Sequence, residues 1–173
     1  GKSSSAITSV LECPSQPFSY ATCRIQTVLV DSKTRKPSPF PDWWRKKYAP
    51  FVQGGQSMIM HHLEKPKTVE TYQTKVSYSD IDAYLHTNWT SYVGFCLEAF
   101  YESVFRNQNK SFDGQVTGKC LKSFEAGFRK ESSMGDELNV YSWVSDQDKR
   151  DIQFEIKHND DICLHARMEY YET

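Results

Sequence analysis

A single long helical segment constrains the fold of this chain more than any other feature. Between residues 89 and 105, apolar side chains recur at helical spacing and cover much of the circumference of the predicted helix. These side chains are Trp89, Tyr92, Val93, Cys96, Leu97, Phe100, Val104 and Phe105. We therefore expect the rest of the fold to enclose most of this helix. Thr87 or Asn88 is expected to cap its N-terminus.

Segments with strand-like alternation of apolar and polar residues surround this helix. One of them, residues 72–78, precedes it. Those that follow it are residues 120–128, 138–144, 152–156 and 162–168. Short, turn-rich connections between the later segments favour an antiparallel meander. The simplest arrangement is an α+β fold in which an antiparallel β-sheet wraps around one long central helix.

The N-terminal part of the chain has a different pattern. Short strands are predicted at residues 7–12 and 20–30, and two strands alone cannot bury a face, so we expect them to add to another sheet. Residues 31–67 are rich in proline and are typical of a linker, with one short helix at residues 42–48. The main domain is then expected to cover residues 68–173.

The charge balance argues against a nucleic-acid binder. The 173 residues include 21 basic and 22 acidic side chains, a formal net charge of −1, whereas phosphate contacts need a basic excess. No apolar run approaches the length of about 20 residues that a membrane span requires. The N-terminus also lacks the apolar stretch of a signal peptide.

The cysteines and histidines predict no disulfide framework and no metal site. The five cysteines are odd in number, widely spaced and without a C-x-x-C pair. We therefore expect reduced, mostly buried thiols in a cytoplasmic compartment, with targeting to an organelle as an open alternative. His61 and His62 are adjacent, but no third ligand is suitably spaced beside them.

The chemically informative residues lie just before the long helix. Asp80, Asp82, His86 and Asn88 stand between a predicted strand and the helix N-terminus, and Glu131 ends a later strand. A carboxylate and an imidazole four residues apart can face one pocket, and N–H groups at a helix N-terminus can stabilise an oxyanion. Hydrolysis of an activated acyl compound requires this combination. On spacing alone, a helix cap and a solvated histidine remain the simpler interpretation.

Residues 76–98 resemble the signature of hotdog-fold thioesterases, which runs D-x-D-x-x-x-H-x-N-N-x-x-Y ahead of a central helix. Within this 4-hydroxybenzoyl-CoA thioesterase-like superfamily, the resemblance is strongest to the C-terminal hotdog of acyl-ACP thioesterases. Residues 128–136 resemble the Y-R-R-E-C segment of that family, and residues 25–51 resemble the end of its first hotdog and the following linker. The resemblance implies a hotdog fold, and it implies that residues 1–30 resemble the end of a preceding hotdog domain.

The same resemblance implies an activity and a set of site residues. The activity is hydrolysis of fatty acyl thioesters, carried on ACP or CoA, to a free fatty acid and a thiol, without a cofactor or a metal. The implied catalytic residues are Asp82, His86 and Glu131. The residues expected to bind the substrate or the oxyanion are Asn88, Tyr84 and Ser132. The chain departs from the family where Tyr84 replaces an asparagine and Ser132 replaces a cysteine.

Two alternative functions stay open. Tyr84 and the incomplete first domain favour a non-catalytic hotdog that binds acyl groups or serves as a scaffold. A hotdog dehydratase or hydratase would share the fold but use a different arrangement of histidine and aspartate. Because the resembling enzymes contain two hotdogs, the chain is expected to be part of a longer double hotdog or to pair with another hotdog, as in a homodimer.

Overall fold

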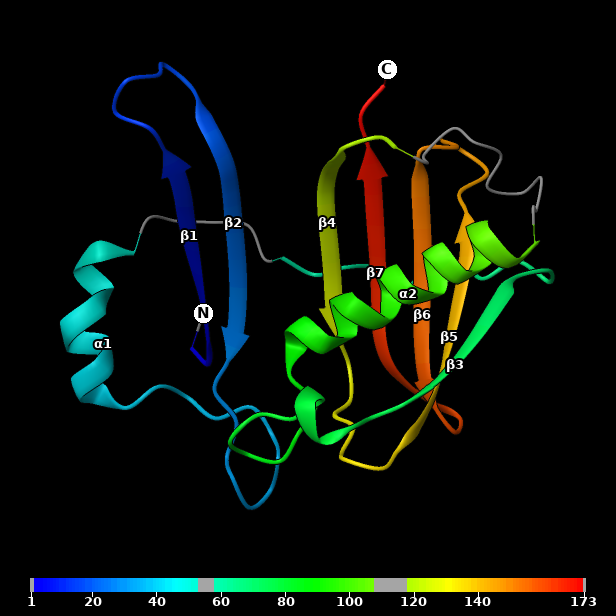
Figure 1. The fold of residues 1–173 in the computed structure, drawn as a ribbon. Helices are drawn as coiled ribbons and strands as arrows, with labels where there is room; N and C mark the ends of the chain where they lie inside the picture. The colour runs from blue at the N-terminus through cyan, green and yellow to red at the C-terminus, as the bar shows by residue number, and fades with distance from the viewer. Residues whose placement is uncertain (1, 53–57, 108–117, 173) are drawn as a thin grey trace. The chain divides into compact units, whose positions relative to one another are not determined.

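The computed structural model describes residues 2–52, 58–107 and 118–172. The chain divides into two units, Gly1–Met58 and Ile59–Thr173, each of which is described by itself (Figure 1). The family signature and the predicted site residues all belong to the second unit. The second unit therefore carries the candidate site.

The first unit consists of a two-stranded sheet and a short helix. Strand β1 (Ser4–Glu12) pairs antiparallel with β2 (Ser19–Val28). Helix α1 (Asp42–Tyr48) follows Pro41 and continues into a 3₁₀ turn, Ala49–Phe51. The two strands and the short helix that the sequence predicts in this part of the chain are thus confirmed. The expected addition of the strands to another sheet is not found among the described residues, where β1 and β2 form a sheet of their own.

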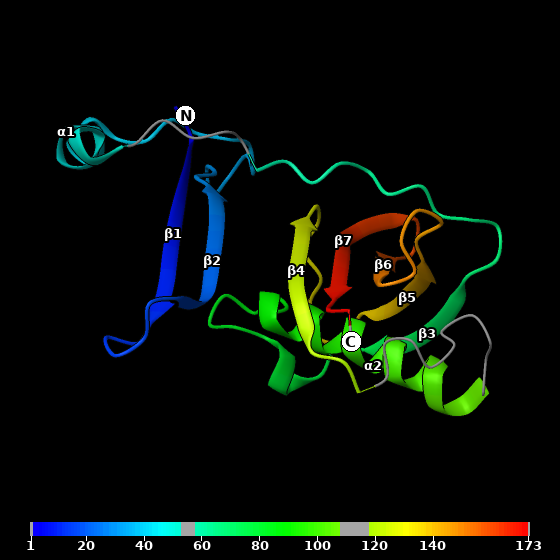
Figure 2. The same ribbon diagram turned by 90° about the horizontal axis from the view of Figure 1, so that it is seen from above.

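The second unit is a five-stranded antiparallel sheet with one long helix across one of its faces (Figure 2). The strand order is β3-β5-β6-β7-β4. The elements are β3 (Glu70–Lys75), a 3₁₀ turn (Tyr78–Asp80), α2 (Trp89–Asn107), β4 (Leu121–Phe128), β5 (Glu137–Val144), β6 (Asp151–His158) and β7 (Asp161–Tyr170). This is the α+β arrangement of sheet and helix that the sequence predicts.

The connection between β4 and β5 differs from the predicted meander. Strands β5, β6 and β7 follow one another as hairpins, but β4 pairs with β7 at the edge of the sheet. Residues 129–136 therefore run past two strands along one end of the sheet (Figure 1). That crossing spans about 14 Å, well within the reach of eight residues. Turn-rich composition does not specify which strand a segment pairs with, so the sequence could not reveal this crossing.

Helix α2 is covered on one side only, so the expectation of an enclosed helix is wrong for the described chain. Its buried residues are Tyr92, Phe95, Cys96, Ala99, Phe100 and Ser103. Trp89, Tyr101 and Phe105 are exposed because the sheet contacts only the opposite side of the helix. No helix in the described ranges is long and apolar enough to cross a membrane.

All five cysteines are free, but they are not mostly buried as predicted. Cys96 and Cys163 lie in the core of the second unit, and burial raises the pKa of both thiols. Cys23 and Cys120 are exposed, and Cys13 is half-buried. The physical reason is clearest for Cys23, since it lies on β2, whose residues are exposed along almost the whole strand.

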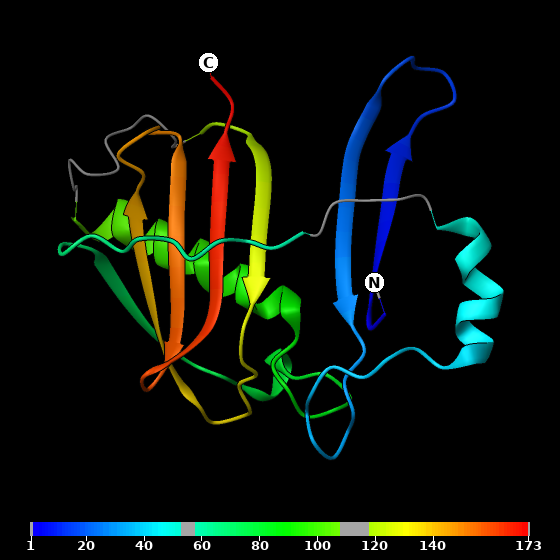
Figure 3. The ribbon, with the colours of Figure 1, turned by 180° about the vertical axis from the view of Figure 1, so that it is seen from behind.

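Residues 59–67, which we call the covering segment, run across the face of the sheet opposite α2 (Figure 3). Arg129 Nη2 donates a hydrogen bond to the carbonyl oxygen of Met60 at 2.6 Å. The absence of a side chain at Gly127 lets Met60 approach β4, because a Cβ atom there would lie 3.1 Å from the Cβ of Met60. Farther along, the rings of His62 and His165 are 4.7 Å apart. The last part of the predicted linker thus packs against the sheet.

The covering segment also completes a buried cluster of ionisable groups. Lys65 Nζ donates to Glu155 Oε1 at 2.6 Å, and His165 Nε2 donates to Glu155 Oε2 at 3.2 Å. Burial opposes ionisation of Glu155, but the hydrogen bonds from Lys65 and His165 outweigh it and keep its pKa below the usual value. Burial lowers the pKa of His165, and its bond to Glu155 offsets this only in part. Glu155 is therefore charged and His165 neutral in the fold at neutral pH.

This cluster predicts a loss of stability in mild acid. Because the pKa of His165 is lower in the fold than its ordinary value of 6.5, the unfolded chain binds this proton at higher pH than the folded chain. The stability that His165 contributes is therefore present above pH 6.5 and is lost as the pH falls below it. We expect the free energy of unfolding to fall by up to about 1.4 kcal/mol per pH unit. Urea titrations between pH 8 and pH 5 measure it. His165→Gln should flatten the dependence of stability on pH. The control His61→Gln removes an exposed imidazole and should leave that dependence as in the wild type. If the His165→Gln profile equals that of the wild type, the assignment to His165 is contradicted.

Candidate active site

A tight loop before α2 carries three of the predicted site residues. Ile81 and Thr87 form an isolated antiparallel bridge that closes it, and the Asp82 N–H donates to the carbonyl oxygen of His86 at 2.8 Å. The Asp82 carboxylate accepts, through Oδ1, the N–H groups of Tyr84 at 2.8 Å and His86 at 3.3 Å. Aspartates stabilise turns in this way. Asp82 therefore shapes the loop that presents His86.

The backbone of this loop is strained next to His86. Leu85 adopts a left-handed conformation with φ 64°. For a residue other than glycine this costs about 1–2 kcal/mol. Such a conformation persists only where surrounding contacts determine it, so the loop is held by its neighbours rather than by local preference.

The crossing connection between β4 and β5 places Glu131 beside His86. The distance between His86 Nε2 and Glu131 Oε2 is 3.6 Å, and the two side chains are 34% and 53% exposed. An isolated antiparallel bridge between His86 and Ser133 joins the loop to the connection. An imidazole and a carboxylate this close, with one side open to solvent, can exchange a proton with a bound molecule.

The three residues predicted to contact the substrate or oxyanion are placed differently from one another. Tyr84 is 80% exposed on the loop. The side chain of Asn88 caps α2, because its Oδ1 accepts the N–H of Thr90 at 3.0 Å. Ser132 is buried and bonds to Thr87 and Tyr92. The structure therefore gives Asn88 and Ser132 local structural contacts, and their roles toward a substrate stay predictions.

Capping by Asn88 has a measurable consequence for stability. Asn88→Ala removes the acceptor of the Thr90 N–H, and we expect it to lower the free energy of unfolding by about 1 kcal/mol. Asn88→Ser restores an acceptor and should recover most of that loss. Urea denaturation of the three proteins measures both effects, and an alanine variant as stable as the wild type would show that the cap contributes nothing.

Tyr92 bonds to Ser132 at this site, although the sequence predicted no functional role for it. It stands at the final Y of the family signature, but its helical spacing placed it only among the apolar residues of α2. The overlooked signal is its hydroxyl, because a buried tyrosine hydroxyl almost always needs a hydrogen-bond partner. Burial raises the pKa of Tyr92, so the hydroxyl stays protonated and is able to donate.

No group of three or more His, Cys, Asp or Glu side chains in the described part of the chain is arranged to hold a metal ion. The adjacent His61 and His62 lie in the covering segment, where the ring of His62 contacts His165.

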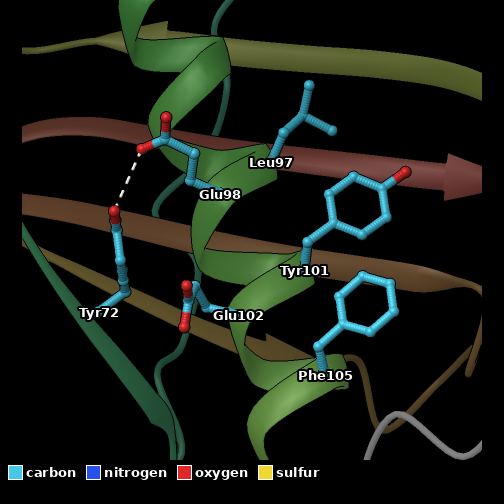
Figure 4. Close-up of a pocket in the computed structure, with 6 residues that line it drawn as sticks. All are labelled: Tyr72, Leu97, Glu98, Tyr101, Glu102 and Phe105. Atoms are coloured by element: carbon cyan, nitrogen blue, oxygen red, sulfur yellow. Dashed lines mark hydrogen bonds between the residues drawn. The ribbon is translucent and has the colours of Figure 1, made fainter.

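A pocket on the outward side of α2 is separate from these residues (Figure 4). It is lined by Tyr72, Leu97, Glu98, Tyr101, Glu102 and Phe105. The Tyr72 hydroxyl donates to Glu98 Oε2 at 3.2 Å across one wall. Burial and the nearby charge of Glu98 raise the pKa of Tyr72. None of the predicted site residues lines this pocket, so it adds nothing to the chemistry of His86 and Glu131.

Comparison with solved structures identifies relatives of the fold. The 12:0-ACP thioesterase from Umbellularia californica superimposes with a TM-score of 0.77 at 19% identity, over 100% of this chain and 64% of that one. A putative oleoyl thioesterase from Lactobacillus plantarum gives 0.72 at 14% identity, over 99% and 64%. The 1,4-dihydroxy-2-naphthoyl-CoA thioesterase from Synechocystis gives 0.50 at 16% identity, over 60% and 80%. At these identities the likeness confirms the hotdog fold.

The chain spans 64% of the length of each of the first two relatives. No curated protein matches its sequence. The profile of the thioesterase-like superfamily, however, matches residues 76–170, which include the loop before α2, the crossing connection and most of the sheet. The chain therefore belongs to the thioesterase-like superfamily.

Proposed function

We propose that the second unit hydrolyses fatty acyl thioesters of ACP or CoA to a free fatty acid and a thiol. The observation that carries this proposal is the distance of 3.6 Å between His86 Nε2 and Glu131 Oε2. Asp82 shapes the loop that presents His86. Membership of the thioesterase-like superfamily supports thioester chemistry. Fatty acyl substrates are supported by the names of two structural relatives, a 12:0-ACP thioesterase and a putative oleoyl thioesterase.

In the proposed reaction a carboxylate, of Glu131 or Asp82, acts on the thioester carbonyl. It either removes a proton from a water molecule as the water oxygen bonds to the carbonyl carbon, or attacks that carbon directly. The carbon–sulfur bond then breaks, and the departing sulfur takes up a proton, from the protonated carboxyl group in the water route and from solvent in the direct attack. A direct attack leaves an acyl-enzyme anhydride that water subsequently hydrolyses. His86 orients the reacting groups and stabilises the developing charge.

The N-terminus of α2 offers fewer donors for an oxyanion than the sequence predicts. The N–H groups of Thr90 and Ser91 already bond to the side chain and backbone oxygen of Asn88. In this proposal His86 is therefore the main group that stabilises the oxyanion. Asn88 follows it closely in the chain. A protonated imidazole is a stronger donor for this purpose than a neutral one.

A non-catalytic, acyl-binding hotdog is the second candidate. It is favoured by the contacts of Asp82, whose Oδ1 already accepts the N–H groups of Tyr84 and His86. In this interpretation Asp82 is a turn former and the exposed Tyr84 replaces a functional asparagine of the family. The acyl group would then be bound without being hydrolysed.

We also propose that β1 and β2 belong to a preceding hotdog and that the second unit pairs with another hotdog, in a longer chain or a homodimer. Support comes from the exposure of Ile7, Leu11 and Ile25 on β1 and β2, since isolated two-stranded sheets are marginally stable. The match of the acyl-ACP thioesterase to this whole chain also supports it.

A hydrolysis assay tests the proposed activity. The chain is incubated with acyl-CoA and acyl-ACP thioesters of increasing acyl length, and the released thiol is measured. Turnover that depends on the acyl length supports the proposal, and the better carrier identifies the thiol. Tight acyl binding without thiol release would support the second candidate, and the absence of both would reject the two together.

A further inference from the structure

Three buried hydroxyl groups join the elements that carry His86 and Glu131. Tyr92 Oη lies 2.7 Å from Ser132 Oγ and accepts the Ser132 N–H at 3.1 Å. Thr87 Oγ1 lies 2.7 Å from Ser132 Oγ and donates to the Ser132 carbonyl oxygen at 3.0 Å. The backbone N–H of Thr87 donates to the same carbonyl at 2.8 Å. We call Thr87, Tyr92 and Ser132 the hydroxyl cluster.

The hydrogen atoms of the cluster can be assigned consistently. Thr87 uses its hydroxyl hydrogen on the Ser132 carbonyl, so the contact between the two hydroxyls is donated by Ser132 Oγ. Tyr92 then donates to Ser132 Oγ and accepts the Ser132 N–H. Each hydroxyl thus donates once and accepts once, which satisfies every polar hydrogen of the cluster. Exposures of 8%, 3% and 1% for Thr87, Tyr92 and Ser132 mean that water cannot readily replace a lost partner.

The cluster connects three separate elements at the site. Tyr92 belongs to the first turns of α2, Thr87 to the loop before it, and Ser132 to the connection between β4 and β5. His86 and Glu131 immediately precede Thr87 and Ser132 in the chain. A shift of Ser132 relative to Thr87 would therefore change the separation of the two side chains on which the proposed reaction depends.

We infer that the Tyr92 hydroxyl is a positioning group that, through Ser132, holds the connection carrying Glu131 against the loop carrying His86. The inference rests on the proposed function for its effect on turnover. It also changes the role of Ser132 from the predicted contact with substrate to a buried link. Because reacting groups displaced by about 1 Å can lose about 100-fold in rate, a modest loosening of this link has a large expected effect.

Tyr92→Phe tests the inference, because it removes only the hydroxyl. Tyr170→Phe is the matched control, since Tyr170 is 4% exposed in the same core and its hydroxyl contacts only Met168 Sδ, at 3.9 Å, among the described residues. We expect kcat to fall by about 10- to 100-fold in Tyr92→Phe with KM within about threefold of wild type. Tyr170→Phe should keep both parameters within about twofold.

Hydrogen exchange provides a second readout that does not need activity. Amides of residues 129–136 should exchange faster in Tyr92→Phe than in wild type, and Tyr170→Phe should leave them unchanged. Thr87→Val and Thr87→Ser extend the test should Tyr92→Phe fold poorly. The valine variant lacks the hydroxyl and should behave as Tyr92→Phe, whereas the serine variant keeps it and should behave as wild type.

The possible outcomes separate this inference from the proposed function. A wild-type chain without thioesterase activity overturns the proposed function, and the exchange of residues 129–136 then decides the inference alone. Unchanged exchange in Tyr92→Phe overturns the inference. So does a kcat equal to that of Tyr170→Phe in an active protein. Faster exchange together with a selective fall in kcat supports it.

Discussion

Turnover of acyl thioesters should fall by about 100- to 10,000-fold when either Glu131 or Asp82 loses its charge, as in Glu131→Gln or Asp82→Asn. Both substitutions keep the size and shape of the side chain, but an amide can neither accept a proton from water nor attack a carbonyl. The rate of thiol release under single-turnover conditions measures the chemical step directly. The fold should survive, since Glu131 is half exposed.

Asp82→Asn is informative because it separates two roles of one side chain. The Oδ1 atom of Asp82 accepts the N–H groups of Tyr84 and His86, and the carbonyl oxygen of an asparagine can accept the same bonds. The loop that presents His86 is therefore expected to persist in the variant. A fall in turnover without a fall in stability would assign the effect to the carboxylate charge.

Glu137→Gln is a matched control for Glu131→Gln. Glu137 is an exposed carboxylate at the start of β5, on the other end of the same connection. Its substitution changes the net charge equally and should leave turnover unchanged. If neither Glu131→Gln nor Asp82→Asn slows the reaction, the catalytic assignment is refuted; if one alone does, that carboxylate is the base or the nucleophile.

The elements of this fold were predictable because their signals are local. Helix α1 lies at the predicted residues 42–48, and α2 begins directly after its capping residue Asn88. Alternation of apolar residues similarly located the strands of the second unit. Periodicity and capping depend on a few neighbouring residues, so one sequence is sufficient to find them.

The pairing of distant segments was not predictable in the same way. The partner of β4 is β7 rather than β5, and this depends on which edge of the sheet remains free after the hairpins form. The contact of His86 with Glu131, and the cluster of Thr87, Tyr92 and Ser132, follow from that crossing. The family resemblance predicted His86, Glu131 and Ser132 as separate site residues. Nothing in the spacing of residues along the sequence indicates that Ser132 would be buried.

The second large effect concerns stability and arises on the opposite face of the sheet. Glu155 is 3% exposed and accepts hydrogen bonds from Lys65 and His165, while Lys157 Nζ lies 3.8 Å away. The ammonium group of Lys65 also lies 3.8 Å from the centroid of the Tyr141 ring. A buried carboxylate that loses its principal cation keeps its desolvation cost without the compensating attraction.

Lys65→Met should therefore lower the free energy of unfolding by about 2 kcal/mol. This is less than a fully buried pair would lose, because Lys65 is 28% exposed and Lys157 remains as a weaker partner. Methionine keeps the apolar stem of lysine, so the variant mainly removes the charge. Lys67→Met removes an exposed ammonium from the same covering segment and should change stability by less than about 0.5 kcal/mol.

A double-mutant cycle identifies the cause of the loss from Lys65→Met. Glu155→Gln removes the charge that Lys65 compensates, so adding Lys65→Met to it should cost much less than Lys65→Met alone. Urea denaturation at pH 7 measures the four proteins under one condition. If Lys65→Met costs the same with and without the Glu155 carboxylate, the segment is held by its packing on Tyr141 and Gly127 instead. The Glu155 carboxylate would then be stabilised by the charge of Lys157 and the hydrogen bond from neutral His165.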